Sequence, residues 1–358
     1  MATRRYGTLD GLRGIAAFMV LIGHLAGPFY PFTLHGYLAV DLFFLMSGFV
    51  VAAAYETRLR AGWGVARFAL VRLKRLWPVY ALSFVLAIAC YLTVRAVKPS
   101  DDFLFPALPL ASVVAMGLLF IPQFVRYGGG ALFPLDPAAW SLSTEMFGNI
   151  VYAAAAPSLS DRTLKILIGI GAFGIAITAF RKGGLNVGFD AVTVVWGYLR
   201  FAFSFPAGVL LYRLHAAGRL PRLPVPPWLV LAATVLLLSG PAPLVALYDT
   251  IVVLFLFPAI TVAALSREPQ ARFAPFFAWC GAVSYPLYVL HQPITGMVLS
   301  IVPRGIGHVV LVLCLPVAII AMAAAAERWF ERPVQRWFKA RRHGVSPGDG
   351  AVIREPAA

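Results

Sequence analysis

Five ionisable side chains lie inside long apolar stretches of this sequence, where a charged group is costly and by default marks a functional site. They are His24, Asp41, Glu145, Arg200 and His291. A histidine titrates near neutral pH, so it can accept and return a proton. A neighbouring carboxylate can orient the ring and stabilise its protonated form. We therefore expect an acid–base site in which His24 is the general base and Asp41 or Glu145 orients it.

Three arginines form a second group with a different chemistry. Arg72 and Arg75 are three residues apart, which places both on one face of a helix, and Arg13 lies at the start of the first apolar stretch. Planar guanidinium groups bind phosphate oxygens through paired hydrogen bonds. The pattern predicts a polyanion site. Acyl-coenzyme A fits such a site as a donor, because its phosphates can bind the arginines while its long arm carries a thioester to His24.

The composition indicates what must position these side chains. The chain has 358 residues, of which 60% are hydrophobic and 13% charged. Soluble proteins have about 45–50% apolar and about 25% charged residues. The net charge of +15 would suggest nucleic acid in a soluble protein, but Lys and Arg also accumulate on the cytoplasmic side of membrane proteins. We therefore expect an all-α polytopic membrane protein that contacts the lipid bilayer and no nucleic acid.

Apolar stretches near the length of a membrane-spanning helix recur along the whole chain. They lie near 10–29, 37–55, 77–97, 107–125, 139–157, 164–180, 193–213, 226–242, 247–265, 279–301 and 306–326. If every stretch spanned, the basic loop near 213–222 and the basic C-terminal tail would fall outside, against the positive-inside rule. Segment 107–125 follows Pro106 and contains Pro122, which suits a re-entrant or interfacial piece. The expected topology is about ten transmembrane helices with both termini cytoplasmic.

This topology assigns a depth to each polar residue. A helix rises about 1.5 Å per residue, so His24 lies roughly 16 Å beyond Arg13. By the same reasoning Asp41, Glu145 and His291 reach a similar depth from three other helices. We expect the acid–base site to lie about 15 Å from the arginines, with the donor entering from the cytoplasm and the acceptor met on the outer side.

Each of these residues also has an ordinary structural explanation. A histidine in a membrane helix can be a hydrogen-bonded packing residue. Asp41 can pair with an arginine, Glu145 can pair with Arg200, and the basic segment 58–75 can simply fix the topology. The sequence leaves these explanations open beside the functional ones.

Other mechanisms and functions stay open as well. The acyl group could rest on a serine before transfer, and the candidates are Ser47, Ser141 and Ser143. A proton-coupled secondary transporter is a rival function, although such transporters usually carry internal repeats, which this sequence does not show. The spacing of histidines and cysteines does not match a metal site, so no metal is expected.

The same residues stand in motifs that resemble the acyltransferase-3 family of integral membrane acyltransferases. The motifs, in the family's order, are Asp10-Gly-Leu-Arg13 with His24, Val40-Asp41-Leu-Phe-Phe-Leu-Met-Ser47-Gly48-Phe49, Arg72-x-x-Arg75 with Pro78 and Tyr80, Trp140-Ser-Leu-Ser-Thr-Glu145, Ser284-Tyr-Pro-Leu-Tyr-Val-Leu-His291-Gln-Pro293, and Glu331-Arg-Pro333. The sequence departs from the pattern at Gly148, where many relatives have an aromatic residue. The resemblance implies a single transmembrane acyltransferase domain over 6–335, followed by a basic cytoplasmic tail over 336–358 that is partly disordered.

The resemblance also implies an activity. It implies an enzyme of the bacterial inner membrane that moves an acetyl or other short acyl group from acyl-coenzyme A, acetyl-coenzyme A above all, to a hydroxyl group. The acceptor would be a surface polysaccharide or a lipid-linked sugar, with a macrolide-type small molecule as the alternative. The residues expected to take part are His24 as the essential residue, Arg13, Arg72 and Arg75 toward the donor, and Arg200, His291, Trp140 and Ser141 in support.

Overall fold

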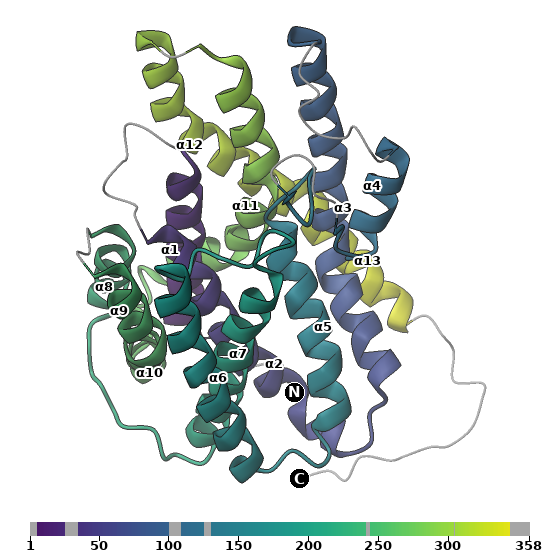
Figure 1. The fold of residues 1–358 in the computed structure, drawn as a ribbon. Coiled ribbons are helices and arrows are strands. Elements are labelled where there is room, and N and C mark those ends of the chain that lie inside the picture. Colours follow the sequence, from purple (N-terminus) through teal and green to yellow (C-terminus); the bar gives the residue numbers. More distant parts are fainter. Residues whose placement is uncertain are drawn as a thin grey trace.

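The computed structural model describes residues 6–25, 35–99, 109–124, 130–240, 244–303 and 305–343. Within these ranges the regular elements are helices, apart from one isolated bridge between Ala131 and Asp190. The helices pack as a bundle in which most run roughly side by side (Figure 1). The prediction of an all-α protein is therefore confirmed for the described part of the chain.

The helices follow the predicted apolar segments in order. In the first half of the chain they are α1 (Gly7–His24), the 3-10 turn η1 (Gly36–Leu38), α2 (Ala39–Arg60), α3 (Val65–Val97), α4 (Leu110–Leu118), α5 (Ala139–Ala155) and α6 (Asp161–Lys182). In the second half they are α7 (Val194–Ala216), α8 (Pro227–Ser239), α9 (Val245–Ile251), α10 (Phe257–Ser266), α11 (Ala274–Ile301), α12 (Ile306–Ala326) and α13 (Arg332–His343). Two π-helical turns, η3 (Val252–Leu256) and η4 (Glu327–Glu331), join α9 to α10 and α12 to α13.

Among the described residues, six helical stretches are long and apolar enough to cross a membrane. They are Gly36–Arg60, Val65–Val97, Asp161–Lys182, Val194–Ala216, Val245–Ser266 and Val309–Arg341. The chain is therefore a multi-pass membrane protein. The predicted total of about ten spans, and the predicted cytoplasmic side of both termini, stay predictions.

In its described residues, 109–124, the segment expected to be re-entrant or interfacial forms only a short helix. Helix α4 has nine residues and is about 14 Å long at 1.5 Å per residue, against about 30 Å for the hydrocarbon core. It lies against α3, where the Tyr80 hydroxyl donates to the Gly117 carbonyl at 2.7 Å and Trp77 Nε1 donates to the Leu118 carbonyl at 3.1 Å. As a helix, this segment is too short to span.

Two boundaries differ from those the hydropathy indicated. Helix α3 begins at Val65 rather than near residue 77, because the charged stretch before Trp77 consists largely of good helix formers. Hydropathy marks the part of a helix that suits lipid, and the helix itself continues beyond it. Helix α1 ends at His24, and the rest of the predicted stretch, 26–29, lies outside the described residues.

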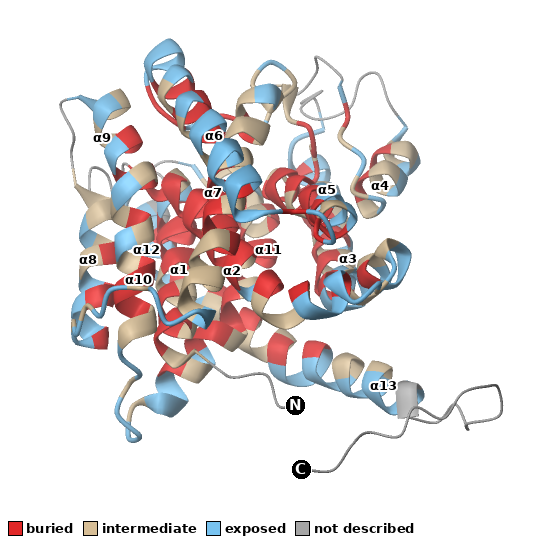
Figure 2. Cartoon of the chain, turned by 90° about the horizontal axis from the view of Figure 1, so that it is seen from below, coloured by how far each residue is buried: buried red, intermediate tan, exposed pale blue. Residues whose placement is uncertain are grey.

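The centre of the bundle is formed by α1, α2, α7 and α11, where buried residues gather, while α6, α8 and α13 carry more exposed surface (Figure 2). Helices α2 and α7 meet at two glycines. A Cβ atom at Gly48 would lie 2.1 Å from the Phe205 carbonyl oxygen, and one at Gly208 would lie 2.0 Å from the Leu45 carbonyl oxygen. Such close contact between backbones needs residues without side chains, and it fixes α2 and α7 relative to each other.

The chain continues as helix beyond the predicted end of the domain at residue 335. After the turn η4, helix α13 runs to His343 and touches α3, because Gln335 Nε2 donates to the Lys74 carbonyl at 2.9 Å. The predicted tail over 336–358 therefore begins inside α13. Residues 344–358 lie outside the described part of the chain.

Candidate active site

A cavity of about 190 Å³ lies between α1, α2, α3, α5 and α11. Its polar lining includes residues from all five helices: Arg13, Ser47, Arg72, Arg75, Ser141, Glu145, Ser284, Tyr285 and Tyr288. Its apolar lining comes mainly from α2, through Val40, Phe43, Phe44, Met46, Val50 and Val51. The cavity therefore combines a cluster of charge with an apolar wall, a combination that suits small-molecule binding.

The three predicted arginines converge on this cavity. Arg72 and Arg75 lie on α3 at the spacing that places them on one face, and Arg13 reaches the same space from α1. Arg13 is held by hydrogen bonds to Asp10 Oδ1 at 3.0 Å, to the Gly281 carbonyl at 3.1 Å and to Ser284 Oγ at 3.1 Å. The structure thus brings together the three arginines that the sequence interpretation grouped.

Each of the other two arginines contacts a carboxylate. Arg72 donates through a terminal nitrogen to Glu145 Oε1 at 2.8 Å, while its buried Nε has no hydrogen-bond partner among the described residues. Arg75 forms an ion pair with Glu331 of the turn η4. The cavity therefore holds guanidinium groups whose positions are fixed, and at least one N–H of Arg72 is left for another acceptor.

Glu145 lies in a different place from the one expected. The depth argument put it level with His24, but it lies beside Arg72, and it also accepts a hydrogen bond from Ser47 Oγ at 2.6 Å. The contact arises because α3 begins at Val65, so Arg72 lies well inside this helix rather than at its edge. Neither the expected pairing with His24 nor the alternative pairing with Arg200 is found among the described contacts.

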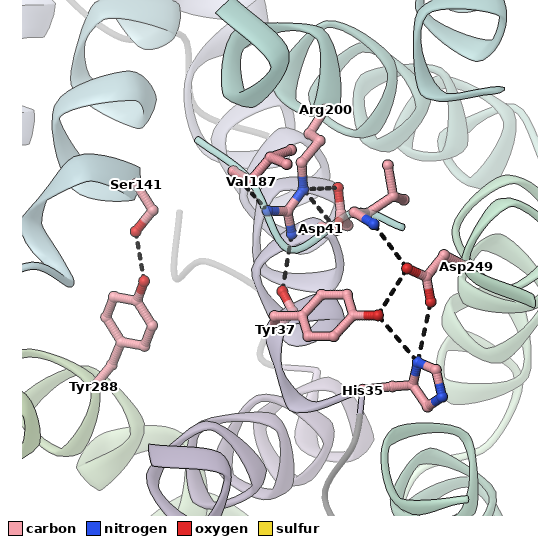
Figure 3. A network of polar contacts seen from close by, with 9 residues as sticks. His35, Tyr37, Asp41, Ser141, Val187, Arg200, Asp249 and Tyr288 are labelled. Carbon is pink, nitrogen blue, oxygen red and sulfur yellow. Dashed lines mark hydrogen bonds and ion pairs between the residues drawn. The ribbon is translucent and has the colours of Figure 1, made fainter. Parts of the chain in front are cut away.

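Asp41 forms a buried ion pair with Arg200 (Figure 3). Arg200 donates to both Asp41 oxygens, with a shortest distance of 2.6 Å, and its other nitrogens reach the Val187 carbonyl at 2.8 Å and the Tyr37 carbonyl at 2.8 Å. The Trp140 ring lies 5.6 Å from the same guanidinium group. The expectation that Asp41 orients His24 is therefore wrong, and Trp140 packs on this pair rather than lining the cavity.

His24 and His291 lie side by side. Their ring centroids are 5.2 Å apart. His24 is the exposed last residue of α1, whereas His291 is buried in α11. His291 Nδ1 lies 2.8 Å from the Tyr288 carbonyl, so this nitrogen carries the proton and Nε2 is a free acceptor, without a partner among the described residues. The two predicted histidines therefore meet, without the carboxylate that was expected to join them.

Tyr288 connects the histidines to the cavity, and the sequence interpretation did not single it out. Its ring lines the cavity and lies 6.0 Å from the His291 ring, and its hydroxyl shares a 2.6 Å hydrogen bond with Ser141 Oγ. Tyr288 precedes His291 by one helical turn, so the two lie on the same face of α11. The spacing of Tyr288 and His291 was therefore the sequence signal that could have identified Tyr288.

A second polar group missed from the sequence lies next to Asp41. Asp249 accepts hydrogen bonds from the Tyr37 hydroxyl at 2.8 Å and the Leu185 backbone N–H at 2.8 Å, and its Oδ1 lies 3.0 Å from His35 Nδ1 (Figure 3). The sequence interpretation assigned no role to His35 and did not consider Asp249. A lone carboxylate within the apolar stretch 247–265 was the signal that could have revealed it.

Another buried carboxylate near the site, Asp136, has no guanidinium partner among the described residues. Asp136 lies in the connection before α5, is fully buried, and accepts a 2.9 Å hydrogen bond from Ser83 Oγ, while Oδ1 has no partner among the described residues. Burial raises the pKa of Asp136 to about 7. Among the described residues no group of three or more His, Cys, Asp or Glu side chains could hold a metal ion.

Comparison with known proteins identifies the class of enzyme. The model of a family described as an acyltransferase domain matches residues 6–327, and the chain belongs to this acyltransferase family. Protein 2 in picA locus of Rhizobium radiobacter is 36% identical over 182 residues, which cover 49% of this chain and 95% of that protein. Exopolysaccharide production protein ExoZ of Rhizobium meliloti (strain 1021) is 26% identical over 317 residues, or 86% of this chain and 92% of that protein. No solved structure gives a significant match. The family expected from the motifs is confirmed.

Proposed function

We propose that this protein is an inner-membrane enzyme that moves an acetyl or other short acyl group from acyl-coenzyme A to a hydroxyl of a surface polysaccharide or a lipid-linked sugar. Membership of the acyltransferase family gives the reaction class. A relative named for exopolysaccharide production supports the sugar acceptor. The assignment of acyl-coenzyme A as the donor rests on the convergence of Arg13, Arg72 and Arg75 on one cavity.

The arginine cluster suits the phosphates of acyl-coenzyme A. Guanidinium groups bind phosphate oxygens with charge-assisted hydrogen bonds, and Arg72 has an unused N–H on Nε. The carboxylates of Asp10, Glu145 and Glu331 hold the arginines in place when no donor is bound. The apolar wall from α2 would then receive the arm that carries the thioester.

His24 is the proposed general base for the acceptor hydroxyl. It lies at the exposed end of α1, where an acceptor can approach, and its ring contacts His291. Since the carboxylates of Asp41 and Glu145 bind arginines, His291 is the residue placed to orient His24. Tyr288 lies between this pair and the cavity, so donor and acceptor would meet at its ring.

The test measures both halves of the reaction in purified full-length protein. Coenzyme A release from acetyl-coenzyme A is followed with and without a bacterial surface oligosaccharide, and the product is weighed by mass spectrometry. We expect the oligosaccharide to gain acetyl groups, and His24→Ala to lose that gain. His215→Gln is a matched control, because His215 packs against Tyr6 and Phe49 and does not line the cavity. Undiminished transfer by His24→Ala would overturn the base assignment.

A second measurement addresses the acceptor in cells. Surface glycans from cells with and without the gene are compared by mass, and we expect the loss of one acetyl group per modified sugar. Unchanged glycans together with acylation of a macrolide by the purified protein would contradict the sugar acceptor and leave the acyltransferase reaction intact. A protein that consumes no acyl-coenzyme A with any acceptor would contradict the proposed donor.

A further inference from the structure

Three serines line the cavity, and two of them have their hydroxyl protons committed to structure. Ser284 Oγ donates to the Gly281 carbonyl of its own helix at 2.8 Å and accepts a hydrogen bond from Arg13. Ser141 Oγ contacts the Ala138 carbonyl at 3.1 Å and the Tyr288 hydroxyl at 2.6 Å. The partners of these two hydroxyls are backbone carbonyls, a guanidinium group and a tyrosine hydroxyl, none of which is a base.

Ser47 differs from these two serines. Its Oγ donates to Glu145 Oε1 at 2.6 Å, across the cavity wall from α2 to α5. An ionised carboxylate can only accept hydrogen bonds, so the Ser47 proton must lie on this bond. Arg72 holds the same carboxylate oxygen at 2.8 Å. Ser47 is therefore a hydroxyl group beside a fixed carboxylate inside the proposed donor cavity, which is the arrangement of an activated nucleophile.

We propose that Ser47 carries the acyl group as an ester between donor and acceptor, with Glu145 as the base that receives its proton. This inference rests on the proposed function and adds an intermediate to it. The reaction then has two halves: the acyl group moves from coenzyme A to Ser47, and afterwards from Ser47 to the acceptor hydroxyl.

Both halves balance without any further reactant. In the first, Ser47 Oγ forms a bond to the thioester carbonyl carbon while its proton passes to Glu145. The carbon–sulfur bond breaks, and the departing sulfur takes the proton from Glu145, giving the Ser47 ester and free coenzyme A. In the second, the acceptor oxygen bonds to the ester carbon and the bond from that carbon to Ser47 Oγ breaks. The proton that the acceptor loses, first to His24, ends on Ser47 Oγ.

The charge around Ser47 favours the first half. Negative charge develops on the carbonyl oxygen as Ser47 attacks, and fixed donors aimed at that charge lower the barrier. The Arg72 Nε–H is the donor that we assign to this role, because Arg72 lines the cavity and its Nε has no partner among the described residues. Arg72 thus holds the base through one nitrogen and leaves another for the developing oxyanion.

The competing explanation is that Ser47 and Glu145 only join α2 to α5, as polar pairs often do between membrane helices. The two explanations differ in one measurable respect. An acyl-enzyme allows labelled coenzyme A to exchange into acetyl-coenzyme A when no acceptor is present, whereas direct transfer from donor to acceptor does not.

The experiment therefore measures that exchange with purified full-length protein, radiolabelled coenzyme A and unlabelled acetyl-coenzyme A. We expect exchange in the natural protein, its loss in Ser47→Ala, and a fall of about a hundredfold or more in Glu145→Gln. His24→Ala should keep the exchange while losing transfer to the oligosaccharide. Ser300→Ala is the matched control, because Ser300 bonds only the Gly296 carbonyl of its own helix in the described contacts and lies away from the cavity.

Two further measurements make the outcome decisive. Thermal unfolding shows whether Ser47→Ala folds, and if it does not, Ser47→Cys replaces it, with an expected acyl-thioester on that residue that hydroxylamine removes. Transfer to the acceptor without any exchange would overturn the Ser47 intermediate and leave the proposed function standing. Exchange that persists in Ser47→Ala would also overturn it. A natural protein that neither exchanges nor transfers would contradict both the intermediate and the proposed function.

Discussion

Two carboxylate–arginine pairs in this molecule have the same chemistry and different surroundings. Asp41 and Arg200 join α2 to α7 and are sealed, with 0% and 1% of their side chains exposed. Glu145 and Arg72 join α5 to α3 and are partly open, with 15% and 11% exposed. The second pair lines the cavity and the first does not. The difference in exposure accompanies a difference in hydrogen bonding.

Arg200 uses every nitrogen, since each one reaches Asp41 or a backbone carbonyl. Arg72 reaches Glu145 through one nitrogen, and its Nε has no partner among the described residues. A buried pair in which every donor is satisfied has no free hydrogen-bond donor for a ligand, so its role is structural. A pair with a spare donor beside a cavity can bind one. The two pairs therefore differ in two respects, exposure and complete hydrogen bonding, and under the proposed function both leave the Glu145–Arg72 pair free to contact a ligand.

The largest expected effect is on the sealed pair. Arg200→Met leaves the Asp41 charge buried without a partner, which should destabilise the protein by about 3–5 kcal/mol. The double variant Asp41→Leu with Arg200→Met removes both charges and should recover part of that loss. Thermal unfolding in detergent compares the two. A double variant less stable than the single one would contradict this explanation, because it would mean that the unpaired Asp41 charge is not what destabilises Arg200→Met.

The next effect concerns the open pair. Arg72→Ala should weaken acetyl-coenzyme A binding by about ten- to a hundredfold, the value of a charge-assisted hydrogen bond of about 1.5–3 kcal/mol. Its melting temperature should fall less than that of Arg200→Met, because Glu145 has access to the cavity. Arg72→Lys keeps the charge without the planar guanidinium group. Its affinity for acetyl-coenzyme A should lie between those of Arg72→Ala and the natural protein. Unchanged donor affinity in Arg72→Ala would place this pair with the structural ones.

Much of the fold was accessible from the sequence, since each apolar segment predicted to span contains a helix. The start of α3 was not, because hydropathy measures fitness for lipid and a basic stretch can continue the same helix. The shift matters for the site. The earlier start of α3 places Arg72 beside Glu145. A depth counted from the apolar edge of the segment could not predict this contact.

The residues of the site were easier to predict than their partners. The spacing of Arg72 and Arg75 depends only on helix geometry, and both residues line the cavity. Which carboxylate meets which arginine depends on how helices distant in sequence pack, as the contact of Gly48 with α7 illustrates. Asp41 was therefore placed in the acid–base site, although it belongs to the buried pair with Arg200.

A smaller effect tests how far the sealed region extends beyond Asp41. Tyr37→Phe removes the 2.8 Å hydrogen bond to Asp249 and should cost about 1.5 kcal/mol, since the acceptor is charged. Tyr248→Phe is the matched control, because its hydroxyl donates to the neutral Leu237 carbonyl at 2.8 Å and should cost about half as much. Thermal unfolding gives both values, and donor affinity should change in neither. A loss of donor affinity in Tyr37→Phe alone would show that the network around Asp249 reaches the cavity.

The last test concerns Asp136, a buried carboxyl with no arginine partner among the described residues. Its pKa rises from 3.8 to about 7 on folding because of burial, so the folded protein binds a proton that the unfolded chain releases. This contribution to stability is complete below the unfolded pKa of 3.8 and is lost as the pH rises toward 7. Asp136→Asn stays neutral and can still accept from Ser83. The melting temperature of Asp136→Asn should therefore rise relative to that of the natural protein as the pH increases from about 5 to about 8. A difference that stays constant over this range would mean that Asp136 ionises in the folded protein as readily as in the unfolded chain.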